Sequence, residues 1–113
     1  MSFDVIDNPH FKEKAHTAGF SNVQFKQLDA LYLKAASLKT LASRSVDCDF
    51  DEGLFEYSYY KSAQRPPFLR FIIRRVGPRT NMYELWHHEK GKILQSGLFE
   101  RVYERLREDI ESL

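Results

Sequence analysis

The sequence predicts a single α+β domain spanning residues 1–113, in which helices at both ends of the chain cover a four-stranded antiparallel sheet. Near both ends, apolar residues recur at three- and four-residue steps, whereas between residues 46 and 95 the period is two. The chain of 113 residues is long enough for one compact domain and too short for two. Amphipathic helices must bury their apolar stripes, and the sheet is the large apolar partner available, so we expect a two-layer sandwich.

The N-terminal part of the chain predicts two helices. Asn8 is the expected N-cap of a short helix that begins at Pro9 and is terminated by Gly19. Ser21 opens a longer helix, with Gln24 three residues later as in a capping box. The apolar stripe of this helix extends to about Arg44 and consists of Phe25, Leu28, Leu31, Tyr32, Ala35, Leu38, Leu41 and Ala42.

The middle of the chain predicts four strands, over residues 54–60, 67–76, 82–88 and 93–95. These segments are rich in aromatic and β-branched residues. A turn over 77–81 and a tight hairpin over 89–92, with Gly91 at positive φ, separate the later strands. Consecutive strands on short loops usually pair as neighbours, which predicts a meander. The last helix, 98–112, carries a stripe of Phe99, Val102, Tyr103, Leu106, Ile110 and Leu113.

Opposite charges are segregated along the chain although its formal net charge is only +1. Residues 47–56 carry five acidic side chains and no base, and residues 57–83 carry six bases and no acid. The near-neutral total does not identify a nucleic-acid or membrane binder. We therefore consider two interpretations, in which the acidic segment neutralises the basic one as a neighbouring strand, or the basic strand is a binding surface.

Strand alternation assigns the basic side chains to one face of the predicted sheet. Leu69, Phe71 and Ile73 point to the core, and the alternate positions point away from it. If Val76 pairs with Met82, then Arg74 faces Glu84, Ile72 faces Trp86 and Arg70 faces His88. The resulting candidate binding surface contains Arg70, Arg74, Trp86 and His88, together with two further arginines of the basic segment, Arg65 and Arg79.

Motifs that would indicate catalysis or a metal are not found in the sequence. Asp47, Asp49 and Asp51 begin like a calcium loop, but Glu52 stands where the loop needs glycine. His87 and His88 are neighbours in a strand and point to opposite faces, so they do not form a simple ligand pair. We assign no catalytic residue, metal or cofactor, and favour a non-catalytic role.

Cysteine use and hydropathy bear on the compartment. The lone Cys48 excludes an internal disulfide and fits a reducing environment. No apolar run approaches the roughly 20 residues that span a bilayer. The first residues lack the apolar core of a signal peptide. We expect a soluble, cytoplasmic protein without a membrane partner.

The function that we favour from the sequence is a small binding or adaptor protein that contacts a protein partner or another copy of itself. A short last strand leaves a sheet edge that can pair with its copy in a homodimer. The alternative is RNA binding through the basic strand 65–79. Guanidinium and aromatic groups side by side on a sheet can hold phosphates and stack bases.

The order of elements also resembles the RelE-type toxins, which cleave messenger RNA on the ribosome. The resemblance rests on strands that read FEYSYY, FLRFII and ELWHH between the early helices and a closing helix, and Arg70 occupies a place like that family's strand arginine. The basic Lys-Lys segment of the family is represented here only by residues 89–92. The resemblance implies cleavage of messenger RNA as a further alternative function.

Overall fold

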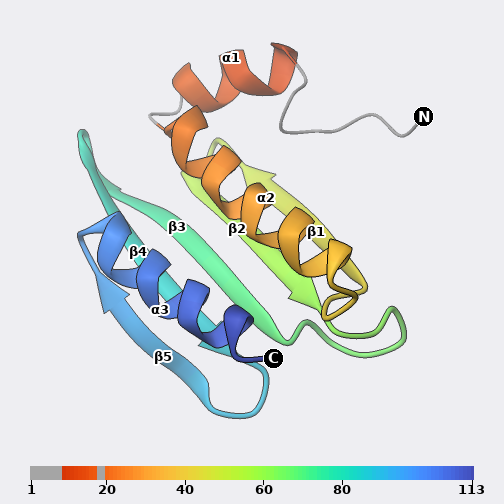
Figure 1. The fold of residues 1–113 in the computed structure, drawn as a ribbon. Helices are drawn as coiled ribbons and strands as arrows, with labels where there is room; N and C mark the ends of the chain where they lie inside the picture. The colour runs from red at the N-terminus through yellow and green to blue at the C-terminus, as the bar shows by residue number, and fades with distance from the viewer. Residues whose placement is uncertain (1–8, 18–19) are drawn as a thin grey trace.

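The computed structural model describes residues 9–17 and 20–113. Five strands form one antiparallel sheet in the order β1-β2-β3-β4-β5, and α2 and α3 lie side by side on one face of it (Figure 1). The elements are α1 (Pro9–Thr17), α2 (Asn22–Ser37), β1 (Ser43–Asp49), β2 (Leu54–Tyr60), β3 (Leu69–Gly77), β4 (Thr80–His87), β5 (Gly91–Ser96) and α3 (Phe99–Glu111). The predicted α+β architecture is confirmed, with five strands in place of four.

The additional strand β1 follows an early end of α2. The prediction that this helix continues to Arg44 is wrong, because the chain reverses after Ser37. Lys39 has a φ of 61° and donates its N–H to the carbonyl of Ala36 at 3.0 Å, while the N–H of Thr40 donates to the carbonyl of Ala35 at 3.0 Å. These two bonds form a Schellman motif that closes the helix. Leu41 fits the apolar pattern of the helix because its side chain is also buried, but it lies in the loop that follows α2.

Two predictions at other chain reversals are confirmed. The Ser21 hydroxyl accepts the N–H of Gln24 at 3.4 Å as the cap of α2, and Gly91 has a φ of 75° in the β4–β5 hairpin. The predicted cap Asn8 and terminator Gly19 lie outside the described residues. Within residues 9–17 and 20–113, no helix has the length and apolar character needed to cross a membrane.

The register between β3 and β4 differs from the predicted one by two residues. The strands are joined by Pro78 and Arg79 alone, with Gly77 opposite Thr80, so the expected five-residue turn is too long. A two-residue shift keeps every side chain on its predicted face. The observed partners are Arg74 with Met82, Ile72 with Glu84, and Arg70 with Trp86, and His88 follows the end of β4.

The core lies between the helices and the face of the sheet that they cover. Its centre is aromatic: the ring of Phe25 on α2 stacks on that of Phe55 on β2, with centroids 4.1 Å apart. Helix α3 contributes the buried part of its predicted stripe, namely Phe99, Val102, Leu106 and Ile110. Burial of such side chains supplies most of the free energy that holds the two layers together.

One carboxylate lies inside this core. Asp29 on α2 is only 6% exposed, and its Oδ1 is 2.7 Å from Nε of Arg44 on β1. The hydroxyl of Tyr57 on β2 donates to the same carboxylate oxygen. The guanidinium of Arg44 also lies over the rings of Tyr32 and Tyr57, at 5.6 and 6.0 Å from their centroids. This Asp29 cluster ties α2 to the first two strands.

Both tyrosines of β2 that face α2 remain protonated. Burial raises the pKa of Tyr57 well above the usual value for a phenol, and the neighbouring Tyr59 and the hydrogen bond to Asp29 add to the effect. Burial likewise raises the pKa of Tyr59, whose hydroxyl donates to the carbonyl of Leu28 at 2.8 Å. The two phenols therefore act as permanent donors to α2.

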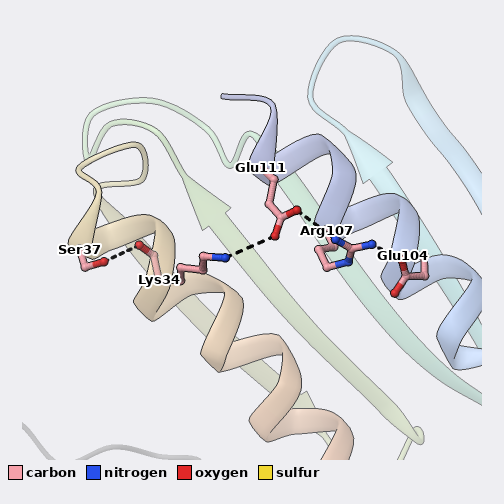
Figure 2. A network of polar contacts seen from close by, with 5 residues as sticks. All are labelled: Lys34, Ser37, Glu104, Arg107 and Glu111. Carbon is pink, nitrogen blue, oxygen red and sulfur yellow. Dashed lines mark hydrogen bonds and ion pairs between the residues drawn. The ribbon is translucent and has the colours of Figure 1, made fainter.

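Exposed ion pairs add a weaker link between α2 and α3 (Figure 2). The Nζ of Lys34 lies 3.6 Å from Oε2 of Glu111, whose other oxygen accepts a bond from Arg107 at 3.0 Å. Arg107 also pairs with Glu104 on the same helix. Exposed pairs of this kind contribute about 0–1 kcal/mol, so the two helices are held mainly by their common core.

We predict that Gly53→Ala destabilises the fold. Gly53 has a φ of +66°, and a Cβ there would lie 2.8 Å from the Cβ of Arg75. The clash and the left-handed backbone together are expected to cost about 1–3 kcal/mol in the free energy of unfolding, measured by urea denaturation. Gly97→Ala is the matched control, because a Cβ at Gly97 meets nothing within 4 Å. Equal stabilities of the two variants would contradict the prediction.

We also predict a large effect of removing the buried carboxylate. Asp29→Ala removes the carboxylate that pairs with the charge of Arg44 and accepts from the hydroxyl of Tyr57, and breaking a buried pair in this way costs about 3–5 kcal/mol. Glu108→Ala on the exposed side of α3 controls for the loss of a negative charge. Chemical denaturation measures both variants, and a loss below about 1 kcal/mol for Asp29→Ala would refute a supporting role for the cluster.

Candidate functional site

The face of the sheet turned away from α2 and α3 is covered by none of the described elements (Figure 1). Strand alternation and the observed register place charged and aromatic side chains on it. We call this surface the open face; its principal side chains are Asp47, Asp49, Glu56, Ser58, Arg70, Ile72, Arg74, Met82, Glu84, Trp86 and Lys92.

The two arginines of β3 are each paired with a carboxylate of a neighbouring strand. Arg70 Nη1 lies 3.1 Å from Oε1 of Glu56 on β2, and Arg74 Nε lies 3.2 Å from Oε2 of Glu84 on β4. The Arg74–Glu84 pair forms diagonally, because Met82 is directly opposite Arg74. Between the two pairs Ile72 is only 5% exposed. The centre of the open face is therefore neutral, with an apolar floor.

Trp86 is held in place on the open face from three sides. Its Nε1 donates to Oε1 of Glu84 at 2.9 Å. The guanidinium of Arg70 and the ammonium of Lys92 lie 5.5 and 5.6 Å from its ring centroid. Cations at this distance are attracted to the indole face. The half-buried ring is thus fixed before any partner arrives.

Glu84 remains ionised although it is nearly buried. Burial alone would raise the pKa of its carboxyl group, but hydrogen bonds from Trp86 and Arg74 and the charges of Arg74 and Lys92 outweigh that effect. The net result is a pKa below the usual value for glutamate. At neutral pH the carboxylate accepts from both neighbours and orients them.

Two adjoining hollows lie where the β2–β3 loop meets the β4–β5 turn. The Trp86 hollow, of about 540 Å³, opens on the open face and is lined by Glu56, Pro67, Arg70 and Trp86. The Lys61 hollow, of about 470 Å³, is lined by Lys61, Arg65, Phe68 and Glu89. Pro66, His87 and His88 line both hollows. The N–H of His88 donates to the carbonyl of Phe68 at 3.2 Å and so joins the two chain segments.

The six residues predicted for the binding surface are not all brought together. Arg70, Trp86 and His88 line the Trp86 hollow, and Arg65 lines the adjoining one. Arg74 lies further along the open face beside Glu84. Arg79 lies in the β3–β4 turn, at the opposite end of the sheet from the hollows (Figure 1).

Several side chains were not anticipated, namely Lys61, Phe68 and His87 at the Lys61 hollow and Lys92 beside Trp86. Lys61 and Phe68 flank a loop whose path the strand pattern does not specify. Lys92 reaches Trp86 because a bulge shifts the β4–β5 register between Leu85 and Trp86. No sequence signal marks that bulge, whereas the basic character of Lys61 beside Arg65 was visible.

The acidic segment forms a strand and a turn. Asp47 and Asp49 are exposed on the open face, and Asp49 Oδ1 accepts the N–H of Glu52 at 3.1 Å in the turn after β1. Cys48 points to the core side, where burial and the charge of Asp47 raise the pKa of its thiol to about 12. Such a thiol is a poor nucleophile at neutral pH. Among the described residues, no three His, Cys, Asp or Glu side chains are grouped to hold a metal ion.

Comparisons of the chain with models of known protein families, with curated proteins and with solved structures found no match.

We predict that the stabilising effect of Glu84 depends on pH. Its pKa is lower in the folded than in the unfolded state, so its contribution is present above the unfolded value of about 4.3 and is lost as the pH falls through the folded value. Urea midpoints of the wild type and Glu84→Gln should differ most at pH 7 and converge as the pH is lowered below 4. A difference that stays constant down to pH 2.5 would contradict this expectation.

Proposed function

We propose that the protein is a non-catalytic binding protein whose open face contacts another protein, and that a second copy of the chain is that partner. The observation that carries this proposal is Trp86, which is fixed between Arg70 and Lys92 on a face that no described element covers. Tryptophan and arginine are the residue types most enriched among those that dominate protein–protein affinity. An anchor already held in one position loses little entropy on binding.

The pairing of charges on the open face supports its burial by a protein. When a partner displaces water, Arg70 keeps the carboxylate of Glu56 and Arg74 keeps that of Glu84, so neither charge is left alone. Leaving a buried charge without its partner would cost several kcal/mol, about 3–5 in typical cases.

The arrangement of charge favours a second copy as the partner. Strand β1, at one edge of the sheet, carries Asp47 and Asp49 on the open face, whereas β5, at the other edge, carries Lys92, and none of these three forms an ion pair with a residue that the structure describes. In a two-fold interface the same patch meets itself after rotation, so the acidic edge of one copy can face the basic edge of the other. The formal net charge of +1 leaves little repulsion between copies.

RNA binding along residues 65–79, with or without cleavage, is the alternative occupant of this face, and the ion pairs favour it less. Arg70 and Arg74 would have to exchange their carboxylates for phosphates. Among the described residues, Arg65 and Arg79 form no ion pair, but they lie at opposite ends of the sheet. The strand therefore offers little uncompensated positive charge to a nucleic acid backbone.

The proposal predicts concentration-dependent dimerisation that requires Trp86. Sedimentation velocity from about 1 µM to about 500 µM covers the affinities of weak to moderate homodimers. Trp86→Ala is expected to weaken the dimer by about 2 kcal/mol or more, roughly 30-fold in Kd. Leu33→Ala on the outer side of α2, where the side chain is 57% exposed, is the matched control and should dimerise as the wild type does.

Circular dichroism of each variant verifies that the fold is intact. A wild-type protein that stays monomeric at the highest concentration, or a Trp86→Ala variant that dimerises unchanged, would overturn the proposal. Salt-sensitive binding of a labelled single-stranded RNA that Arg70→Ala/Arg74→Ala abolishes would instead support the RNA alternative.

A further inference from the structure

A second site is indicated by the cations that the sheet leaves without acidic partners. Lys61 and Arg65 both belong to the β2–β3 loop and both line the Lys61 hollow. Neither forms an ion pair with any residue that the structure describes, in contrast to Arg70 and Arg74 on the open face. Glu89 is the single acidic residue in the wall of this hollow. The local charge therefore favours an anion.

A histidine on the same wall adds a further donor. Nδ1 of His87 accepts the backbone N–H of Glu89 at 3.0 Å and that of Lys90 at 3.3 Å. With Nδ1 acting as an acceptor, the proton of the neutral ring is on Nε2, which is a donor. Lys61, Arg65 and His87 thus place an ammonium, a guanidinium and an imidazole in the lining of one hollow. Phosphate oxygens can accept from all three, and a guanidinium matches them in a bidentate manner.

An aromatic wall lies beside these donors. Phe68 is half-buried, and its ring meets that of His87 edge-on, with centroids 5.3 Å apart. The Nζ of Lys61 lies 4.0 Å from the centroid of the Phe68 ring. Because this lysine is an exposed, flexible side chain, a flat ligand ring can replace it on the face of Phe68 while the ammonium moves to the anion.

The size of the hollow fits a small ligand with more than one part. Its volume of about 470 Å³ exceeds the needs of a bare phosphate ion and lies within the range usual for small-molecule sites. Pro66 and Phe68 give it an apolar part beside the charged loop residues. This combination calls for a ligand with an anionic end and a flat apolar body.

We propose that the Lys61 hollow binds a small phosphate monoester that also contains a flat ring, as a nucleoside monophosphate does, with the phosphate at Lys61 and Arg65 and the ring against Phe68. Such a group is available from a free mononucleotide or from the 5′-phosphorylated end of a single strand. The site does not use Trp86, although Pro66, His87 and His88 also line the adjoining Trp86 hollow.

Calorimetric titration of the full chain with AMP, adenosine and inorganic phosphate tests this proposal. AMP should bind, adenosine should bind at least about tenfold more weakly, and inorganic phosphate should bind more weakly than AMP because it lacks the ring. Lys61→Ala/Arg65→Ala should lower the affinity for AMP at least about tenfold. Phe68→Leu should weaken the binding of AMP more than that of inorganic phosphate, since it removes only the stacking surface.

Lys14→Ala/Arg79→Ala is the matched control, because it removes the same charge from exposed positions on α1 and in the β3–β4 turn, at the other end of the molecule (Figure 1). It should bind AMP within about twofold of the wild type, as should Trp86→Ala, which separates this site from the open face. Absence of AMP binding at about 5 mM, equal binding of adenosine, or full binding by Lys61→Ala/Arg65→Ala would overturn the proposal.

Short single-stranded RNA with a 5′-phosphate or a 5′-hydroxyl distinguishes the two sources of the ligand. If the phosphorylated strand binds more tightly than AMP and the 5′-hydroxyl strand does not, the ligand is a 5′-phosphorylated strand end. AMP binding at least as tightly as the phosphorylated strand identifies a free mononucleotide. Equal binding of both strands, with no loss in Lys61→Ala/Arg65→Ala, counts against the site.

Discussion

The ion pair between Asp29 and Arg44, completed by the hydroxyl of Tyr57, fixes the geometry on which the rest of the structure depends. A carboxylate inside an aromatic core is tolerated only where its partners reach it, so α2 must lie over β1 and β2 in one position. Tyr57 can serve because burial keeps its hydroxyl protonated. Once α2 is placed in this way, one face of the sheet is committed to the helices and the opposite face is left to solvent.

The two sides of the sheet handle charge in different ways. On the helix side, the cluster around Asp29 links the helix layer to the sheet. On the open face, Arg70 and Arg74 form ion pairs with Glu56 and Glu84 of the neighbouring strands. Lys61 and Arg65 have no such acidic partner among the described residues, because they lie in the β2–β3 loop, outside the paired strands. The molecule thereby separates a neutral surface suited to a protein from a cationic hollow suited to a small anion.

Strand faces were predictable from the sequence because alternation survives a register error of two residues, as the partners of Arg70 and Arg74 illustrate. Strand β1 was missed because SRSVDCD has few aromatic or β-branched residues and follows a leucine that extends the helical pattern of α2. The hollows could not be foreseen, since they depend on loop paths and on the bulge beside Trp86. Local periodicity predicts elements and faces, whereas convergence of loops requires three-dimensional placement.

The order of strands in the sheet has a consequence for how the chain reaches its native state. Each strand pairs with its immediate predecessor in sequence, so hairpins can form one after another across short loops. The contacts of α3 with β4 and β5 join neighbouring parts of the chain, whereas its contacts with α2 span a much longer stretch. Closing such a long loop carries the larger entropic cost. This topology favours rapid assembly of the meander, with the packing of α2 against α3 as a late step that completes the hydrophobic layer.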